Sequence, residues 1–367
     1  MKRIFFVLLL SISVVALMLA ACQPTSPAVM ATSSPLNTAT VEPTNIPPQA
    51  TLPPTPKPLI AIPIDAGNAA QLKAINQAGV TEPYRLVWSR DGSSFWVITT
   101  STAELFDSQT FESTHVFNNA SGQSVLDVSP DGHMLAITTD NQNIQLVDIT
   151  SGKNLALIQT AGGFDAVSFS PDGSRLTSNS MDVIRADLWD TTNGQIITSL
   201  SGFQTAAPVY DASIGTDNKT LIWHARATIT LQDIASQKMG ATFSHEDFVE
   251  SVALSPDGNL LAVGAGGTIN GQFTPVLFLY NAHSGQSVKK IPVQDTFSAF
   301  SFSPDGKLLG AASGQQVTIW DMDSLKIIAS FSAHGDQVAD LAFSPDGKTL
   351  LTCGGDNLVK SWQVIQP

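Results

Sequence analysis

Hydrophobic and polar positions alternate along most of this chain in short runs, and polar turns interrupt the runs at regular intervals. Runs of this length with a period of two residues predict β-strands. One phrase recurs every 40 to 48 residues: a hydrophobic run, Ser-Pro-Asp-Gly or a near copy, a second hydrophobic run, and a hydrophobic or aromatic residue followed by Asp. Repetition at this period predicts an array of four-stranded units. The phrase occurs seven times, with its turn beginning at Ser129, Ser170, Ser255, Ser303 and Ser344 and with degraded copies at Ser89 and Gly215.

The residues of the turn have separate physical roles. Proline presets φ for the second turn position, aspartate accepts hydrogen bonds from nearby backbone, and glycine adopts the left-handed conformation that returns the chain to a strand. The run 166–169 precedes one such turn and the run 135–137 follows another. A second polar turn then leads to a third strand that ends in Trp189-Asp190 or a related pair, and a fourth strand follows. Each repeat therefore predicts four antiparallel strands.

These residues resemble the WD40 family of β-propellers, and the resemblance extends from near Ile64 to the C-terminus. The last repeat matches best, although Ala333 and Gln363 replace the family's Gly and final Asp. The poorer repeats fit other propeller families with the same turn, such as the lactonase-like ones, nearly as well. The resemblance implies a buried hydrogen-bond network in the last repeat, formed by His334, Thr352, Asp356 and Trp362.

The number of strands indicates how the ring closes. The chain ends at Val364-Ile365 on the third strand of the seventh repeat, so that the outer strand of this repeat must come from the N-terminal part. The segment 69–75 is the expected closing strand, and a helix is the alternative for this Ala- and Gln-containing stretch. The predicted fold is all-β: a monomeric, seven-bladed propeller of four-stranded antiparallel blades over residues 64–367, closed by an N-terminal strand.

The N-terminus predicts export and lipidation. Lys2 and Arg3 precede an apolar run over residues 4–19, and Leu19-Ala20-Ala21-Cys22 matches the bacterial lipobox. Residues 1–21 are therefore expected to be a lipoprotein signal peptide, with Cys22 as the lipidated residue. An uncleaved membrane anchor is the alternative, since the run is close to the lower length limit of a spanning helix. Either way, we expect the rest of the protein outside the cytoplasm, attached to the cell membrane on the cell surface or in the periplasm.

Residues 22–63 are expected to form a disordered tether. The stretch from residue 23 to 58 contains ten prolines and seven threonines, and Glu42 and Lys57 are its only charged residues. Proline-rich segments adopt extended polyproline geometry and cannot build a core. At about 3.1 Å per residue, such a tether holds the propeller at a distance from the membrane.

Charge and cysteine content exclude several classes of function. The formal net charge is −13, and nucleic-acid binding needs clustered Lys and Arg, so that no nucleic-acid partner is expected. Apart from Cys22, Cys353 is the remaining cysteine, which excludes a disulfide framework within one chain. No Gly-x-Ser-x-Gly, His-Glu-x-x-His or EF-hand motif occurs. We therefore expect no catalytic residues, no metal site and no cofactor.

Gly264-Ala265-Gly266-Gly267 is interpreted as part of a long hairpin loop that runs to about Thr274.

The mouth of the central channel is the expected place for binding. Aromatic and acidic residues alternate near those ends of the inner strands that face it, and such groups favour a basic protein or peptide partner. Alternatively, the carboxylates solvate loops and the aromatic side chains pack between blades. The candidates are Tyr84, Arg85, Phe164, Asp165, Tyr210, Asp211, Phe248, Glu250, Phe297, Asp336 and Asp340.

Two functions remain open at this point. The first is a membrane-anchored, non-catalytic protein–protein interaction scaffold of the cell envelope. The second is a propeller enzyme, such as a lactonase-like hydrolase, with its site at the channel mouth. Approach of three or more of Asp165, Asp211, Glu250, Asp340 and a histidine to within metal-binding distance would favour the enzyme.

Overall fold

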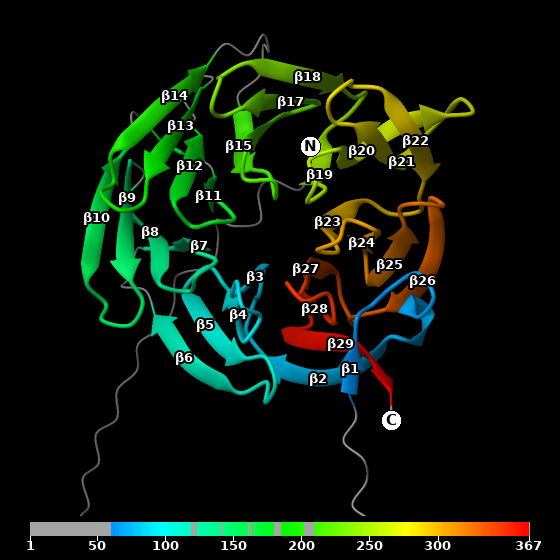
Figure 1. The fold of residues 1–367 in the computed structure, drawn as a ribbon, viewed down its shortest axis with the longest axis horizontal. Helices are drawn as coiled ribbons and strands as arrows, with labels where there is room; N and C mark the ends of the chain where they lie inside the picture. Colours follow the sequence, from blue (N-terminus) through cyan, green and yellow to red (C-terminus); the bar gives the residue numbers. More distant parts are fainter. Residues whose placement is uncertain are drawn as a thin grey trace, which may run out of the picture. The chain divides into compact units, whose positions relative to one another are not determined.

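A computed structural model describes residues 60–118, 123–140, 142–160, 163–164, 166–179, 185–201 and 209–366. For Asp140, Ser201, Val209, Tyr210 and Asp211, only the backbone is described. The described residues form seven antiparallel sheets arranged in a ring, as Figure 1 shows. The structure therefore confirms the seven-bladed β-propeller.

The first three blades each run from an inner strand beside the channel to an outer strand at the rim. Blade 1 consists of β3 (Arg85–Trp88), β4 (Ser94–Ile98), β5 (Thr102–Asp107) and β6 (Ser113–Asn118). Blade 2 consists of β7 (Val125–Val128), β8 (Met134–Asp140), β9 (Asn143–Asp148) and β10 (Asn154–Gln159). Blade 3 consists of β11 (Val167–Phe169), β12 (Arg175–Asn179), β13 (Arg185–Asp190) and β14 (Ile196–Ser201).

The next three blades have the same order. Blade 4 consists of β15 (Val209–Ile214), β16 (Thr220–Ala225), β17 (Thr228–Asp233) and β18 (Met239–Ser244). Blade 5 consists of β19 (Val249–Leu254), β20 (Leu260–Ile269), β21 (Gln272–Asn281) and β22 (Ser287–Pro292). Blade 6 consists of β23 (Phe297–Phe302), β24 (Leu308–Ser313), β25 (Gln316–Asp321) and β26 (Lys326–Ser332).

Blade 7 joins the two ends of the described chain. Its C-terminal strands are β27 (Val338–Phe343), β28 (Thr349–Gly354) and β29 (Leu358–Gln366). The outer strand is β2 (Lys73–Gly79), which pairs with β29 from Lys73↔Gln363 to Gly79↔Leu358. A short fifth strand, β1 (Ile60–Ile62), pairs with the end of β29. The N-terminal part thus closes the ring, as predicted.

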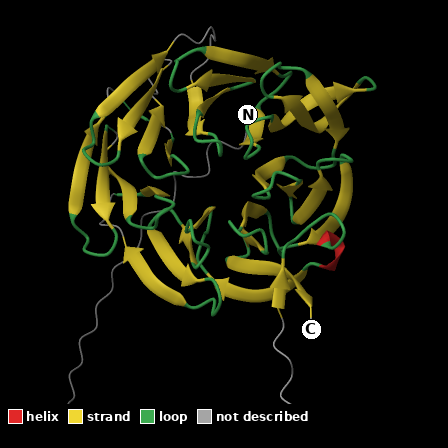
Figure 2. Ribbon diagram, viewed as in Figure 1, coloured by secondary structure: helices red, strands yellow, loops and turns green. Residues whose placement is uncertain are grey.

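The expected position of the closing strand, residues 69–75, is wrong by four residues at its start. Ala69–Gln71 form the short 3-10 helix η1, the helical segment coloured in Figure 2, and the strand begins at Lys73. The sheet also includes β1, which precedes the expected propeller start at residue 64. Among the described residues, no helix is long and apolar enough to cross a membrane.

The Ser-Pro-Asp-Gly turns connect the first and second strand of each blade. In the last repeat, the Ser344 hydroxyl donates to Asp346 Oδ1 over 2.7 Å and accepts the Thr349 N–H over 2.9 Å. Gly347 has a φ of 69°, a conformation that is open to glycine without steric cost. The serine thus binds both the aspartate and the start of the next strand, which explains its recurrence in the phrase.

Apolar packing between neighbouring blades forms the core. Leu351 of blade 7 lies in one buried cluster with Phe95 of blade 1. Leu277 of blade 5 similarly packs with Leu309 of blade 6. Because each cluster contains side chains from two blades, the ring is stabilised mainly at the faces between blades.

The expected long loop of the fifth repeat is wrong. Residues 260–269 and 272–281 form strands that pair along their whole length, from Leu260↔Asn281 to Ile269↔Gln272. Asn270 and Gly271, with φ of 52° and 78°, form a two-residue turn. The glycines of this segment lie in strands because aromatic rings occupy the space of a side chain: a Cβ on Gly264 would lie 2.9 Å from the Phe297 ring.

Candidate binding surface at the channel mouth

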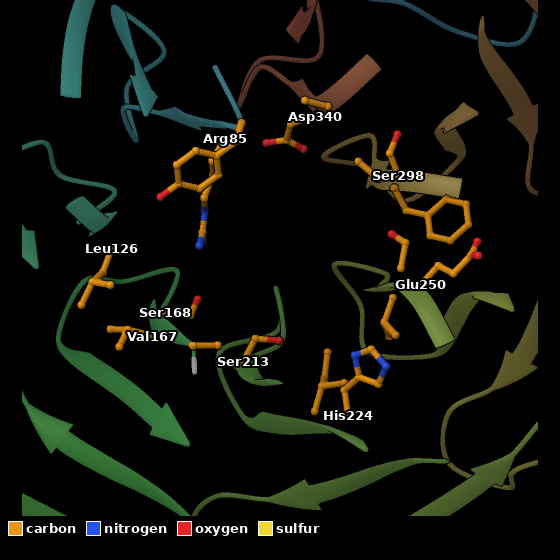
Figure 3. Close-up of a pocket in the computed structure, with 17 residues that line it drawn as sticks. Arg85, Leu126, Val167, Ser168, Ser213, His224, Glu250, Ser298 and Asp340 are labelled. Carbon is orange, nitrogen blue, oxygen red and sulfur yellow. The ribbon is translucent and has the colours of Figure 1, made fainter. Parts of the chain in front are cut away.

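A central cavity of about 550 Å³ opens between the inner strands. Figure 3 shows nine labelled side chains around it, and these come from all seven blades. The lining is mixed: the aromatic ring of Tyr84, which directly precedes β3, a cation from β3, hydroxyls from several strands, and carboxylates from β19 and β27. The labelled residues are Arg85, Leu126, Val167, Ser168, Ser213, His224, Glu250, Ser298 and Asp340.

Four of the predicted mouth residues line this cavity: Tyr84, Arg85, Glu250 and Asp340. The Tyr84 side chain is 40% exposed, and its hydroxyl donates to the Val125 carbonyl of blade 2 over 3.0 Å. Burial of the hydroxyl raises the pKa of Tyr84. Arg85 lies 3.2 Å from Asp127 of blade 2, whose side chain is buried. The aromatic ring of Tyr84 remains accessible, whereas the polar groups of both side chains connect two blades.

Both described carboxylates that line the cavity accept backbone N–H groups. Asp340 Oδ2 accepts the Leu86 N–H of blade 1 over 2.8 Å, and its Oδ1 accepts the Leu341 N–H. Glu250 Oε2 accepts the Phe297 N–H of blade 6 over 3.1 Å. The expectation that these carboxylates favour a basic partner therefore needs revision for Asp340, because backbone N–H groups occupy both of its oxygens, whereas Glu250 is exposed.

These contacts belong to a pattern that connects every pair of neighbouring blades. In each pair, a side chain near the inner strands of one blade binds the backbone of the next inner strand, and such bonds fix the spacing between blades. The seven bonds run from Tyr84 to Val125, Asp127 to Phe169, Thr177 to Ala212, Thr216 to Leu254, Glu250 to Phe297, Ser298 to Val338 and Asp340 to Leu86.

The remaining candidates lie elsewhere or outside the described part. Phe297 is a core residue, 4% exposed and packed on Phe300, which contradicts its assignment to the mouth. Phe164 packs against the cluster between blades 2 and 3, and Asp336 is exposed on the loop before β27. Phe248 is exposed beside Arg226 and does not line the cavity. Asp165 is not among the described residues, and neither are the side chains of Tyr210 and Asp211.

Sequence reasoning missed other lining residues. Ser168, Ser213 and Ser298 lie on inner strands, where alternation along the strand could have identified them. His224 comes from the second strand of blade 4, and no pattern in the sequence marks it as a channel residue. Its presence depends on how blade 4 is placed beside the channel.

We expect a pH-dependent contribution to stability from Asp340. Burial raises the pKa of this carboxyl to about 6. Because the folded-state pKa exceeds the unfolded value, its stabilising contribution is complete below the unfolded pKa and is lost as pH rises through about 6, by up to about 3 kcal/mol. Urea unfolding from pH 4 to 7 should therefore show a loss in the wild type that Asp340→Asn lacks. Asp336→Asn, an exposed carboxyl nearby, is the control; parallel curves for wild type and Asp340→Asn would contradict the assignment.

The four residues singled out in the last repeat are joined by hydrogen bonds. His334 Nδ1 lies 2.8 Å from Asp356 Oδ1, and His334 Nε2 lies 2.8 Å from Thr352 Oγ1. The Trp362 indole N–H donates to the same hydroxyl over 2.9 Å. With the proton of His334 on Nδ1, every donor has an acceptor. The Trp362 indole donates to the Thr352 hydroxyl, and this hydroxyl donates to His334 Nε2. His334 Nδ1–H then donates to Asp356 Oδ1. The network connects β28, β29 and the turn between them with the loop before β27.

The charge state of this network follows from its surroundings. Burial lowers the pKa of His334 and outweighs the opposing effect of Asp356. Burial acts against ionisation of Asp356 too, but hydrogen bonds from the Gly335 N–H and His334 lower the pKa of this carboxyl overall. The pair therefore consists of a neutral imidazole and a carboxylate at neutral pH. Blade 3 keeps part of the arrangement, since the Trp189 indole donates to the Ser178 hydroxyl over 2.9 Å.

Comparison with known proteins supports the WD40 β-propeller family. The family model described as WD domain, G-beta repeat matches residues 237–270 and 325–363. Each matched segment begins near an outer strand and continues into the next blade, and the second contains the complete hydrogen-bonded network. The first segment reaches the first two strands of blade 5, and the second reaches the three C-terminal strands of blade 7. In both, a histidine stands ten residues before the serine of the turn, at His245 and His334.

Several proteins of known name are similar to parts of the chain. Cell division cycle 20.1, cofactor of APC complex, from Arabidopsis thaliana is 26% identical over 65% of this chain and 53% of its own length. Meiotic fizzy-related protein 1 from Schizosaccharomyces pombe is 25% identical over 64% of this chain and 55% of its own length. Small ribosomal subunit protein RACK1 from Caenorhabditis elegans is 35% identical over 33% of this chain and 38% of its own length. The chain thus spans about half the length of the first two relatives.

Proposed function

We propose that this chain is a lipid-anchored, extracytoplasmic WD40-type protein that acts as a non-catalytic protein–protein interaction scaffold, with its binding surface at the channel mouth. The observation that carries the proposal is the cavity, because all seven inner strands contribute side chains to one open surface that holds an accessible aromatic ring. Aromatic side chains are frequent anchors of protein interfaces. The names of the similar proteins, a cofactor of a complex and a ribosomal subunit protein, also fit a role within assemblies.

The hydrolase alternative has less support from the described side chains. Glu250 and Asp340, two of the carboxyls on which it depends, bind backbone N–H groups of neighbouring blades. Within the part of the chain that the structure describes, no group of three or more His, Cys, Asp or Glu side chains converges in a way that could hold a metal ion. The geometry of these residues therefore favours a structural role for the carboxylates.

The anchor is proposed from the sequence alone, since Cys22 and the segments around it lie outside the described residues. We expect Cys22→Ala to abolish acylation, because lipid transfer requires the cysteine thiol of the lipobox. Metabolic labelling with a fatty acid, followed by fractionation, measures both lipid incorporation and membrane association. Lipid incorporation that persists in Cys22→Ala would contradict the lipoprotein assignment.

We expect the mouth to determine partner affinity. Tyr84→Ala should weaken binding by more than about 1 kcal/mol, because it removes the accessible ring that lines the cavity. Glu250→Gln should mainly change the association rate and its salt dependence. The partner is first captured from an envelope extract and identified. Its affinity and association rate for each purified variant are then measured by surface plasmon resonance over a range of salt concentrations.

Two substitutions at the rim serve as controls for this experiment. Lys153→Ala and Lys326→Ala change charge at the outer strands, away from the cavity lining, and should have little effect. Thermal unfolding shows whether Tyr84→Ala keeps the ring intact, since its hydroxyl also connects blades 1 and 2. A partner that responds to the rim substitutions and not to the mouth would show that the site lies elsewhere.

A further inference from the structure

The hairpin of blade 5 extends beyond its own sheet. The inner strand begins at Val249, which pairs with Ala265, whereas β20 continues for four more residues and β21 begins correspondingly early. In Figure 1, the tip of this hairpin projects past β22 at the rim of the ring. The register places the tip on the same face as the beginnings of the inner strands, which is the face of the channel mouth.

An exposed aromatic ring lies on this extension. Phe273 is 60% exposed, and its ring lies over Gly266 so closely that a Cβ on this glycine would come within 2.4 Å of the ring. The same Cβ would lie 3.1 Å from Asp247 Cβ, which places the ring beside the loop that precedes β19. Thr268, the cross-strand partner of Phe273, donates to Glu246 Oε2 over 2.6 Å. The hairpin and the loop are therefore connected on this face.

The loop adds charge and a second aromatic side chain. Glu246 is exposed and Asp247 is half-buried, and Phe248 follows them with 38% exposure. The Arg226 guanidinium lies over the Phe248 ring, 4.4 Å from its centroid, and so helps to hold the ring in place. We name the surface formed by Glu246, Asp247, Phe248 and Phe273 the blade-5 platform.

We propose that the blade-5 platform is a second docking surface, separate from the channel, for a cationic segment of a partner protein that also carries a large apolar side chain. The charge of the platform supports a cationic partner, because it carries two carboxylates, of Glu246 and Asp247, against the one guanidinium of Arg226, on a chain with a net charge of −13. Exposed rings of this size are frequent anchors, and glycine at position 266 leaves the space that the end of the Phe273 ring occupies. Lysine or arginine would pair with the carboxylates while the apolar side chain contacts the rings.

Defined peptides test this proposal directly. The probes are three short fluorescein-labelled peptides of equal length, built from Lys and Leu, from Lys and Ser, and from Glu and Leu, and their binding is measured by fluorescence anisotropy. The Lys/Leu peptide should bind, the Lys/Ser peptide about tenfold more weakly, and the Glu/Leu peptide not at all. Equal binding of the first two peptides, or binding of the third, would overturn the proposed chemistry.

Matched variants locate the binding. Phe273→Ser should weaken Lys/Leu binding about tenfold, and the double variant Glu246→Gln/Asp247→Asn should reduce both affinity and its salt dependence. Gly266→Ala, which displaces the Phe273 ring without removing it, should also weaken binding. Ile327 on blade 6 is 57% exposed, so that Ile327→Ser controls for nonspecific hydrophobic binding and should have no effect.

Three results would overturn the assignment. The first is wild-type affinity for the Lys/Leu peptide in Phe273→Ser, and the second is an equal loss of that affinity in Ile327→Ser. The third is self-association of the wild type in sedimentation velocity that depends on Phe273, because a second copy of the chain would then be the occupant. Tyr84→Ala should leave Lys/Leu binding unchanged, so that failure at the platform and failure at the channel mouth can be distinguished. Because Phe273 lies on a hairpin tip, its replacement should not change the melting temperature, and circular dichroism verifies this.

Discussion

A chain that begins at Val80 is expected to lose the closed ring. Such a truncation removes β1 and β2, which together pair with the outer side of β29, and it removes Ile64 and Ala69 from the core cluster between blades 6 and 7. Burial of one aliphatic side chain such as Ile64 contributes about 1.5–3 kcal/mol, and the lost strand pairing adds to this. A loss of several kcal/mol is a large part of the stability of a domain, which is about 5–15 kcal/mol. Thermal and urea unfolding, with limited proteolysis, measure the effect.

Two shorter truncations separate the contributions of the N-terminal segments. A chain that begins at Ile60 keeps every described residue and should unfold like the full chain. A chain that begins at Pro63 lacks only β1, which pairs through Ile60, Ala61 and Ile62, and should lose less than the chain that begins at Val80. Equal melting temperatures for the chains that begin at Ile60 and Val80 would show that β2 does not close the ring.

The sequence predicts the existence of this closing strand better than its position. Counting strands from the C-terminus requires an outer strand from the N-terminal part, and that inference needs no side-chain detail. The start of the strand depends on a local turn: Asp65 Oδ1 accepts the N–H groups of Gly67 and Asn68, and the Asn68 side chain donates to the Pro63 carbonyl. These bonds hold η1 in place, so that the strand begins only at Lys73. Asp and Asn at this spacing could have indicated the turn.

The hairpin of blade 5 shows a different limit of sequence reasoning. Four residues with three glycines are typical of a loop, because glycine loses the most conformational freedom in a strand. In the structure the glycines are required by aromatic rings: Phe278 of the same hairpin lies against Gly267, and Phe297 of blade 6 lies against Gly264. These contacts form only when the hairpin pairs and blade 6 packs against it, and local pattern therefore cannot show them.

The channel mouth was predictable at the level of strand ends. Four of the proposed residues line the cavity because they lie where inner strands begin, and alternation of side chains along these strands identifies such positions. Which polar atoms remain accessible is set by the distance between blades. Asp340 and Glu250 reach the backbone of the next blade, and the sequence of a single repeat contains no information on that distance.

We expect the hydrogen-bonded network of blade 7 to contribute to stability as one unit. His334→Ala or Asp356→Ala should each cost about 1–3 kcal/mol, because either change leaves a polar partner in or beside the core without its hydrogen bond. The double variant should cost less than the sum, since the second change removes a partner that has already lost its bond. Urea unfolding of the four proteins at pH 7 measures this coupling, and strictly additive losses would count against the network.

Blade 5 provides a matched control in the same chain. His245 stands at the position of His334, but it contacts the rings of Phe278 and Tyr280, and neither of its buried ring nitrogens has a hydrogen-bond partner among the described residues. Burial lowers the pKa of His245 to about 4, so that its contribution to stability is lost as pH falls from about 6.5 to about 4. His245→Phe should therefore be neutral or stabilising at pH 7 and should reduce the loss of stability in acid.

His334→Phe should be destabilising at pH 7, because Thr352 and Asp356 lose their shared partner while the apolar volume remains. A similar cost for both substitutions would mean that the imidazole at this position contributes through packing alone.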